Sequence, residues 1–227
     1  MFILRCRLLG QILFLRYAYL FLILGTTPAS SNELPGNLDI HSTMPQYIDL
    51  HVHTAGLGND SSGIYVHPKL KQSYKFSFYL QAFGVTEEDL NEHGDRLILS
   101  KIATKIRKSI HLKRSVILAL DGVINDEGAL DYGRTQIYVP NDFLIRELPA
   151  HPELLFGASV NPYRKDALTR LDQAVSNGAV LLKWIPNIMH IDPADPKIIP
   201  FYKRLAQYKL PLLTPVSYTH LTLPTKA

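Results

Sequence analysis

YIDLHVH, residues Tyr47–His53, is the stretch of sequence that decides the fold, because it is the first of five short apolar runs. The others cover residues 115–121, 154–161, 179–184 and 210–214. Near-continuous apolar runs of this length are typical of strands that are buried on both faces of a parallel sheet. We therefore expect five parallel strands.

Segments with helical spacing separate these runs. They cover residues 97–110, 141–148, 165–176 and 200–208. Strands that alternate with helices in this way predict an α/β fold with a parallel sheet. Residues 54–91 form a long excursion after the first strand, which we expect to be an active-site loop.

Two α/β architectures fit this alternation, an open doubly wound sheet and a barrel. The turn after the first strand, TAGLGN at residues 54–59, lacks the glycine pattern that cradles the phosphates of a dinucleotide. Polar side chains that suit a metal ion precede this turn instead. The sequence therefore favours the barrel.

The composition fits one globular domain, since 46% of the 227 residues are apolar and 19% are charged. The single cysteine, Cys6, excludes an internal disulfide framework and a cysteine-based zinc cluster. The formal charge is +4, but the basic excess lies in residues 1–30 and 216–227, and residues 31–215 are balanced. The charge therefore gives no support for a nucleic-acid partner or a stable membrane role, and we expect neither.

Residues 1–43 stand apart from the expected fold. Residues 1–30 contain three arginines, no acidic residue and the apolar run 17–24, in the order of a secretory leader. The same segment suits a weak membrane anchor, and in a third interpretation translation starts at Met44. The third interpretation predicts a cytoplasmic protein, and the first two predict a secreted or membrane-anchored one.

The other end of the chain is unusual in a different way. Residues 216–227, VSYTHLTLPTKA, resemble the translation of a sequencing adapter. We therefore expect an artefactual tail after a native sequence that runs to Thr214, with a hybrid codon at Pro215. His220 is for this reason not a candidate ligand, and the body of the protein is residues 44–215.

His51 and His53 are the first candidate metal ligands. Residues two apart on a strand point to the same side, so both imidazoles project together at the carboxyl end of the first strand. Barrel enzymes place their active sites at this end of the strands, and neutral imidazole is a common zinc ligand. Asp49 lies on the same face and could orient an imidazole.

Lys183 and Asp121 are the candidate catalytic residues, because each ends a predicted strand at the same edge of the sheet. Lys183 could join the metal site or act as a cation toward a substrate. Asp121 and Asn161 could line the mouth of the barrel as contacts to the substrate, although both residue types are also common in turns.

Three segments, taken in order, resemble the amidohydrolase-related metal-dependent hydrolases. They are residues 47–53, residues 157–168 (GASVNPYRKDAL) and residues 182–187 (LKWIPN). The resemblance implies a (β/α)8 TIM barrel in which His51 and His53 bind a divalent metal, expected to be zinc. Lys183 takes the place of the lysine that some relatives carbamylate, which makes it a further metal ligand.

The same resemblance implies a barrel that is truncated after about strand five. The family's later ligands, histidines that end strands five and six and an aspartate after strand eight, have no counterpart here. A complete protein would use metal-activated water to hydrolyse an amide, ester or related carbonyl of a small-molecule substrate. We expect the fragment itself to be inactive, and a homo-oligomer is compatible with this interpretation.

Three alternatives remain open at this point. The first is a non-oxidative decarboxylase of the same fold. The second is a polymerase-and-histidinol-phosphatase-type phosphoesterase, whose Ser-Asp-Gly after the D-L-H-x-H-T motif has no counterpart at residues 55–59. The third is a non-catalytic truncated product, because five strands leave a barrel with unpaired edges.

Overall fold

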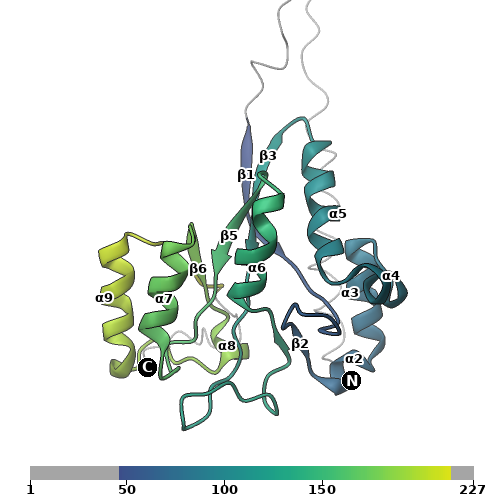
Figure 1. Ribbon diagram of the computed structural model, residues 1–227. Helices are drawn as coiled ribbons and strands as arrows, with labels where there is room; N and C mark the ends of the chain where they lie inside the picture. The colour runs from purple at the N-terminus through teal and green to yellow at the C-terminus, as the bar shows by residue number, and fades with distance from the viewer. Residues whose placement is uncertain (1–45, 216–227) are drawn as a thin grey trace, which may run out of the picture. The chain divides into compact units, whose positions relative to one another are not determined.

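The computed structural model describes residues 46–215, in which five parallel strands lie side by side in the order of the chain (Figure 1). The strands are β1 (Tyr47–His53), β3 (Leu112–Leu118), β5 (Leu154–Ala158), β6 (Leu181–Lys183) and β7 (Leu212–Leu213). Each new strand is added to the same side of the previous one, and the sheet curls into a half-barrel. The expected α/β class and five-stranded parallel sheet are confirmed.

The strand boundaries differ most at β3. It begins at Leu112, three residues before the expected start, where Tyr47 pairs with it, and it ends at Leu118. The chain then leaves the sheet, because Leu120 forms an isolated antiparallel bridge with Val139. Asp121 therefore lies beyond the strand and not at its last position.

The helices that precede the later strands are confirmed to within a few residues. They are α5 (Arg96–Arg107), α6 (Asn141–Glu147), α7 (Ala167–Ser176) and α9 (Ile199–Tyr208). Short helical turns lie between them: η2 (Leu148–Ala150), α8 (Pro186–Met189) and η3 (Pro196–Ile198). The α7 helix ends before Gly178, whose φ of 82° is the left-handed conformation that glycine favours.

The expectation that residues 54–91 form one long loop is wrong. Most of the segment is ordered as β2 (Tyr65–Val66), α2 (Pro68–Lys71), α3 (Tyr74–Phe83) and α4 (Glu87–His93). β2 pairs in antiparallel fashion with β4 (Ile137–Tyr138). A capping box between Thr86 and Asp89 begins α4, since each side chain accepts a hydrogen bond from the other residue's backbone N–H.

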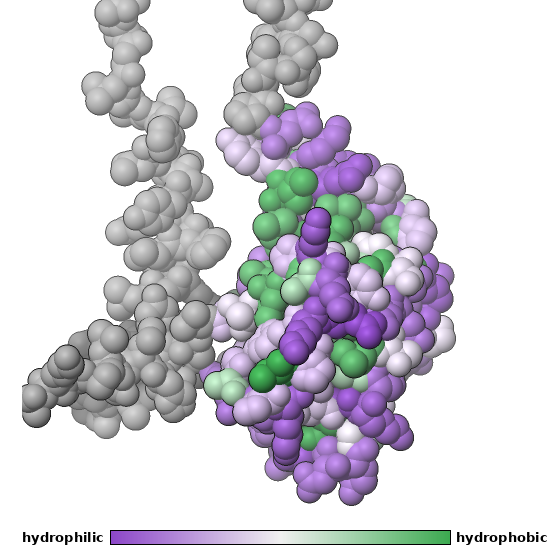
Figure 2. Space-filling view, turned by 90° about the vertical axis from the view of Figure 1, so that its left-hand side faces the viewer, coloured by the Kyte–Doolittle hydropathy of each residue, from purple (hydrophilic) through white to green (hydrophobic). Residues whose placement is uncertain are grey.

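β1 and β7 are the two edges of the sheet, and they keep apolar side chains near solvent. Ile48 and Leu50 on β1 are about half exposed, and both residues of β7 are half-buried. Figure 2 shows several apolar patches among hydrophilic residues on one face of the molecule. No helix formed by residues 46–215 is long and apolar enough to cross a lipid bilayer. The segments expected to be a leader or an adapter-derived tail, residues 1–43 and 216–227, lie outside the described residues.

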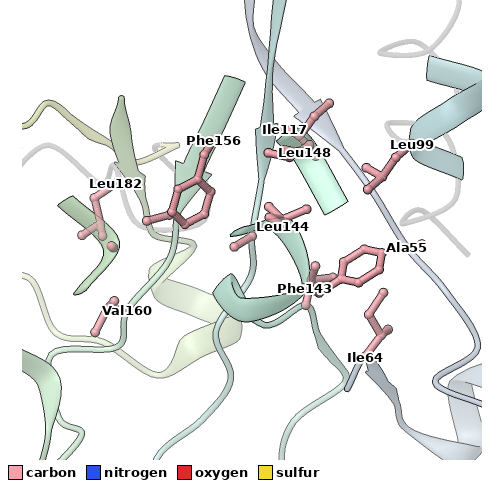
Figure 3. Close-up of a cluster of buried hydrophobic side chains, with 14 of the residues drawn as sticks. Ala55, Ile64, Leu99, Ile117, Phe143, Leu144, Leu148, Phe156, Val160 and Leu182 are labelled. Atoms are coloured by element: carbon pink, nitrogen blue, oxygen red, sulfur yellow. The ribbon is translucent and has the colours of Figure 1, made fainter. Parts of the chain in front are cut away.

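The side chains of the sheet alternate between two apolar clusters. On the inner, concave side, Val116, Leu118 and Leu181 form a small cluster that Leu155 and Leu213 extend. On the outer side a larger core joins the strands to the covering helices, and Figure 3 shows part of it around Phe143, Leu144 and Phe156. Gly157 faces the inner cluster, where a Cβ would lie only 2.7 Å from Leu118 and 2.8 Å from Val116.

Candidate metal site at the carboxyl edge of the sheet

Three nitrogen atoms converge where β1 and β6 end. The Nε2 atoms of His51 and His53 are 3.0 Å apart, and Nζ of Lys183 lies 3.3 Å from Nε2 of His51. Lys183 is separated from His51 by 132 positions in the sequence, and the order of the parallel strands brings them together. The structure therefore unites three of the residues that the sequence singled out.

Each of these side chains is directed by strand alternation. His51 and His53 share the face of β1 opposite Val52, which packs on the outer core, and Lys183 follows Leu181 of the inner cluster by two positions. Lys183 is buried, whereas the two imidazoles belong to exposed residues. No hydrogen bond among the described residues joins the carboxylate of Asp49 to either ring, but its Oδ1 accepts a hydrogen bond from the backbone N–H of His51 at 2.9 Å.

The electrostatics of the cluster favour neutral side chains. Displacement of water by surrounding protein atoms lowers the pKa of His53 to about 4, and positive charge on His51 and Lys183 acts in the same direction. The pKa of His51 is also lowered, by loss of hydration and then by Lys183, against the opposing effect of Asp49. Burial lowers the pKa of Lys183. Both imidazoles therefore keep a lone pair available at neutral pH.

The donor set fits part of a metal site. Two nitrogen ligands at 2.0–2.1 Å from a tetrahedral zinc ion are about 3.3 Å apart, close to the 3.0 Å between the two Nε2 atoms. Within residues 46–215, no group of three or more His, Cys, Asp or Glu side chains lies close enough to hold a metal ion. His51 and His53 could therefore supply two of the ligands of a metal ion, and no third His, Cys, Asp or Glu among residues 46–215 lies close enough to join them.

Asp121 has a different environment from the one expected. Its carboxylate accepts hydrogen bonds from Arg164 at 2.6 and 2.7 Å and from the backbone N–H of Asn161 at 2.8 Å. Both side chains of the ion pair are buried. No hydrogen bond or ion pair among the described residues joins Asp121 to His51 or to Lys183. The contacts indicate a structural role, and a catalytic role for Asp121 stays a prediction.

Asn161 connects the ion pair of Asp121 and Arg164 to the segments that follow three of the strands. Its Nδ2 donates to the carbonyl oxygens of Gly122 and Met189, at 2.9 and 2.8 Å, and the residue is fully buried. Gly122 follows β3, Asn161 follows β5 and Met189 follows β6. Asp121, Arg164 and Asn161, which we call the loop clamp, thus tie together the loops at the carboxyl edge of the sheet.

Ser159 connects the loop clamp with the end of β6. Its hydroxyl donates to the carbonyl oxygen of Lys183 at 2.8 Å and accepts from the backbone N–H of Asp121 at 3.0 Å. Sequence reasoning missed both Ser159 and Arg164. Nothing in the local pattern around Arg164 indicates a partner 43 positions away.

Asp95 shapes the loop that follows His53. Its buried carboxylate accepts hydrogen bonds from the N–H groups of Leu57 and Gly58, at 2.7 and 3.0 Å, and from the hydroxyl of Ser62 at 2.6 Å. A Cβ at Gly56 would collide with the same carboxylate. No local pattern in the sequence signals this interaction, because Asp95 lies 38 positions from Leu57.

Replacing Asp95 with Asn should lower the free energy of unfolding by about 1–3 kcal/mol, because buried N–H groups lose an acceptor. Burial raises the pKa of Asp95, against the hydrogen bonds from Ser62, Leu57 and Gly58. The folded state therefore holds this proton more tightly than the unfolded chain, and wild-type stability falls as the pH rises from about 4 through the raised pKa.

Urea unfolding at pH 4.5 and pH 7 measures this effect, and we expect the advantage of the wild type over Asp95→Asn to shrink as the pH rises. Asp126→Asn, at an exposed position, is the matched control and should change little. An advantage that grows with pH would show that the hydrogen bonds to the carboxylate outweigh its burial.

Three other histidines lie at the ends of helices. Nδ1 of His67 accepts a hydrogen bond from the backbone N–H of Lys69 and caps α2, while the side chain of His93 is about half exposed at the end of α4. His190 is the C-cap of α8 with a φ of 52°. None of the three lies in the cluster of His51 and Lys183.

Comparisons of the chain with protein-family models, with curated proteins and with solved structures found no match. The class that the structure itself defines is a mixed α/β half-barrel with a curled parallel sheet.

Proposed function

We propose that this chain is the N-terminal part of a metal-dependent hydrolase of the amidohydrolase type, with His51 and His53 as ligands of a divalent ion, zinc in the first place. The observation that carries the proposal is the convergence of the Nε2 atoms of His51 and His53 with Nζ of Lys183, within 3.0 and 3.3 Å, at the carboxyl edge of a parallel sheet. Barrel enzymes carry their chemistry at this edge.

A bound divalent ion supplies a water with a pKa near ~7 and polarises the carbonyl of a substrate. The chain's own residues set the protonation state of the ligands and the position of the neighbouring amine. Loss of hydration keeps the imidazoles of His51 and His53 in the neutral form that binds metals, as their lowered pKa values indicate. Ser159 holds the backbone of Lys183 and so fixes where its amine lies beside His51.

The proposal includes a complete (β/α)8 barrel around this site. It is supported by the sequential strand order, the curl of the sheet and the apolar side chains that both edge strands leave near solvent. A closed barrel pairs such edges and fills its interior with apolar layers, of which Val116, Leu118 and Leu181 would be part. The substrate we propose is a small molecule with an amide, ester or related carbonyl.

The test begins with the gene. Its sequence beyond codon 214 should encode a histidine at position 215 and, further on, an aspartate after the last strand; a stop codon at position 215 would contradict the proposal. The longer protein should hydrolyse members of an amide and ester panel only when loaded with zinc. Release of CO2 or of phosphate, without hydrolysis of carbonyl substrates, would favour the decarboxylase or the phosphoesterase instead.

A further inference from the structure

A group of basic side chains projects from the amino-terminal edge of the sheet, at the opposite end of the strands from His53 and Lys183. β1 and β3 extend beyond β5 here, because β5 begins only opposite Ser115 (Figure 1). The loop from α5 to β3 crosses this end. We call the exposed basic residues of this loop, of the last turn of α5 and of the start of β3 the basic tip: Lys105, Arg107, Lys108, Lys113 and Arg114.

Local structure accounts for only two of these charges. Lys105 and Arg107 lie in the last turn of α5, where the helix dipole favours cations, and Arg107 also forms an ion pair with Glu153. Lys108, Lys113 and Arg114 make no side-chain hydrogen bond and no ion pair with any residue of the range 46–215. Lys113 and Arg114 line one hollow with Arg107 and Glu153, and the carboxylate of Glu153 is paired with Arg107. The remaining exposed cations are suited to an anionic partner.

Apolar side chains accompany the charges. Ile110 is 63% exposed in the loop, and Tyr47, at the start of β1, is 58% exposed. The hydroxyl of Ser109 accepts hydrogen bonds from the backbone N–H groups of His111 and Leu112 and so fixes the loop. In Figure 2 the corresponding end of the molecule, at the top, is mostly hydrophilic with apolar surface next to it.

We infer that the basic tip docks on an anionic lipid surface. An aliphatic side chain surrounded by Lys and Arg suits the boundary between headgroups and acyl chains, where a tyrosine ring is also favourable. A nucleic-acid backbone would bind the cations but would gain nothing from Ile110. Gln46 lines a hollow of about 410 Å³ together with Ile110 and Lys113, so apolar and basic groups share this end of the fold.

This inference departs from the expectation that the balanced charge of residues 31–215 gives no membrane role. The balance is an average over the body, whereas the structure places five exposed cations near one end of the sheet. The inference does not depend on the proposed function, because the basic tip and the nitrogen cluster lie at opposite ends of β1. A docked chain would present His51 and His53 away from the lipid.

The test is co-sedimentation of the full chain with vesicles of phosphatidylcholine alone and with vesicles that also contain phosphatidylserine. We expect binding only to the second kind, and binding that weakens as salt is added. Each Lys or Arg near an anionic surface contributes roughly a fivefold factor, so K108Q/K113Q/R114Q should bind about a hundredfold more weakly. I110S should bind several-fold more weakly than the wild type.

K69Q/K75Q/K203Q is the matched control, since it removes the same charge from exposed positions outside the basic tip. It should bind phosphatidylserine vesicles about as well as the wild type, and urea midpoints should show that both triple variants fold. Equal binding by the wild type and K108Q/K113Q/R114Q would overturn the inference. So would displacement of the wild type from vesicles by a single-stranded DNA oligomer at micromolar concentration together with equal binding by I110S, which would identify a nucleic-acid surface.

Discussion

Replacing Asp121 with Asn is expected to lower the free energy of unfolding by about 3–5 kcal/mol, because it leaves the buried guanidinium of Arg164 without its charged partner. The same carboxylate accepts a hydrogen bond from the backbone N–H of Asn161, so the substitution loosens the loop clamp that joins three loops. A carboxylate that was free for catalysis would not be needed for folding to this extent.

Urea unfolding of Asp121→Asn beside the wild type measures the loss. Asp131→Asn is the matched control, because Asp131 pairs with Arg134 at 2.6 Å near the surface, and the side chain of Arg134 is about half exposed. An ion pair of this kind contributes less than about 1 kcal/mol. The double variant D121L/R164M removes both buried charges and should recover much of the stability. If Asp121→Asn unfolded within about 1 kcal/mol of the wild type, the structural role of the loop clamp would be wrong.

The parallel sheet could be predicted from the sequence because its information is local. Runs such as residues 154–161 are apolar throughout, and the segments between them have helical spacing and ordinary stop signals. The boundaries are harder to predict, because they depend on partners. β3 begins at Leu112 because Tyr47 pairs with it, and no property of residues 112–114 themselves, which include two cations, indicates a strand.

The candidate site was predictable to the extent that topology decides it. His51 and His53 share a face by alternation, and Lys183 ends a strand of the same parallel sheet, so all three had to reach the same edge. The order of the strands then determines that Lys183 approaches His51. Contacts that depend on loop conformation were not predictable. Arg164 binds Asp121, which lies 43 positions away in the sequence, and Asp95 binds Leu57, which lies 38 positions away. No local sequence pattern specifies the loop conformations that bring these residues together.

The short helices at residues 68–93 could not be predicted from the sequence for a different reason. They are short, and α2 has only four residues, so an apolar period has little room to develop. The capping box of Thr86 and Asp89 is a local signal for the start of α4, and the expectation of a single loop over residues 54–91 does not take it into account.

The second prediction with a large expected effect concerns the affinity of the protein for zinc. His51→Ala and His53→Ala should each lower the affinity for zinc by roughly a hundredfold or more, because each removes one of the two imidazoles that the described chain offers. Both residues are exposed at an edge strand, so we expect the urea midpoint to change little. Loss of zinc without loss of stability would separate a ligand role from a structural one.

His93→Ala is the matched control, since it removes an exposed imidazole from the end of α4, far along the chain from His51. The decisive measurement is the zinc content of the longer protein, which carries the family's later ligands, and of each variant made in it, after loading and dialysis against metal-free buffer. We expect about one zinc ion per chain for the wild type and for His93→Ala, and nearly none for His51→Ala and His53→Ala. Equal zinc content in all four proteins would contradict a metal site built on His51 and His53.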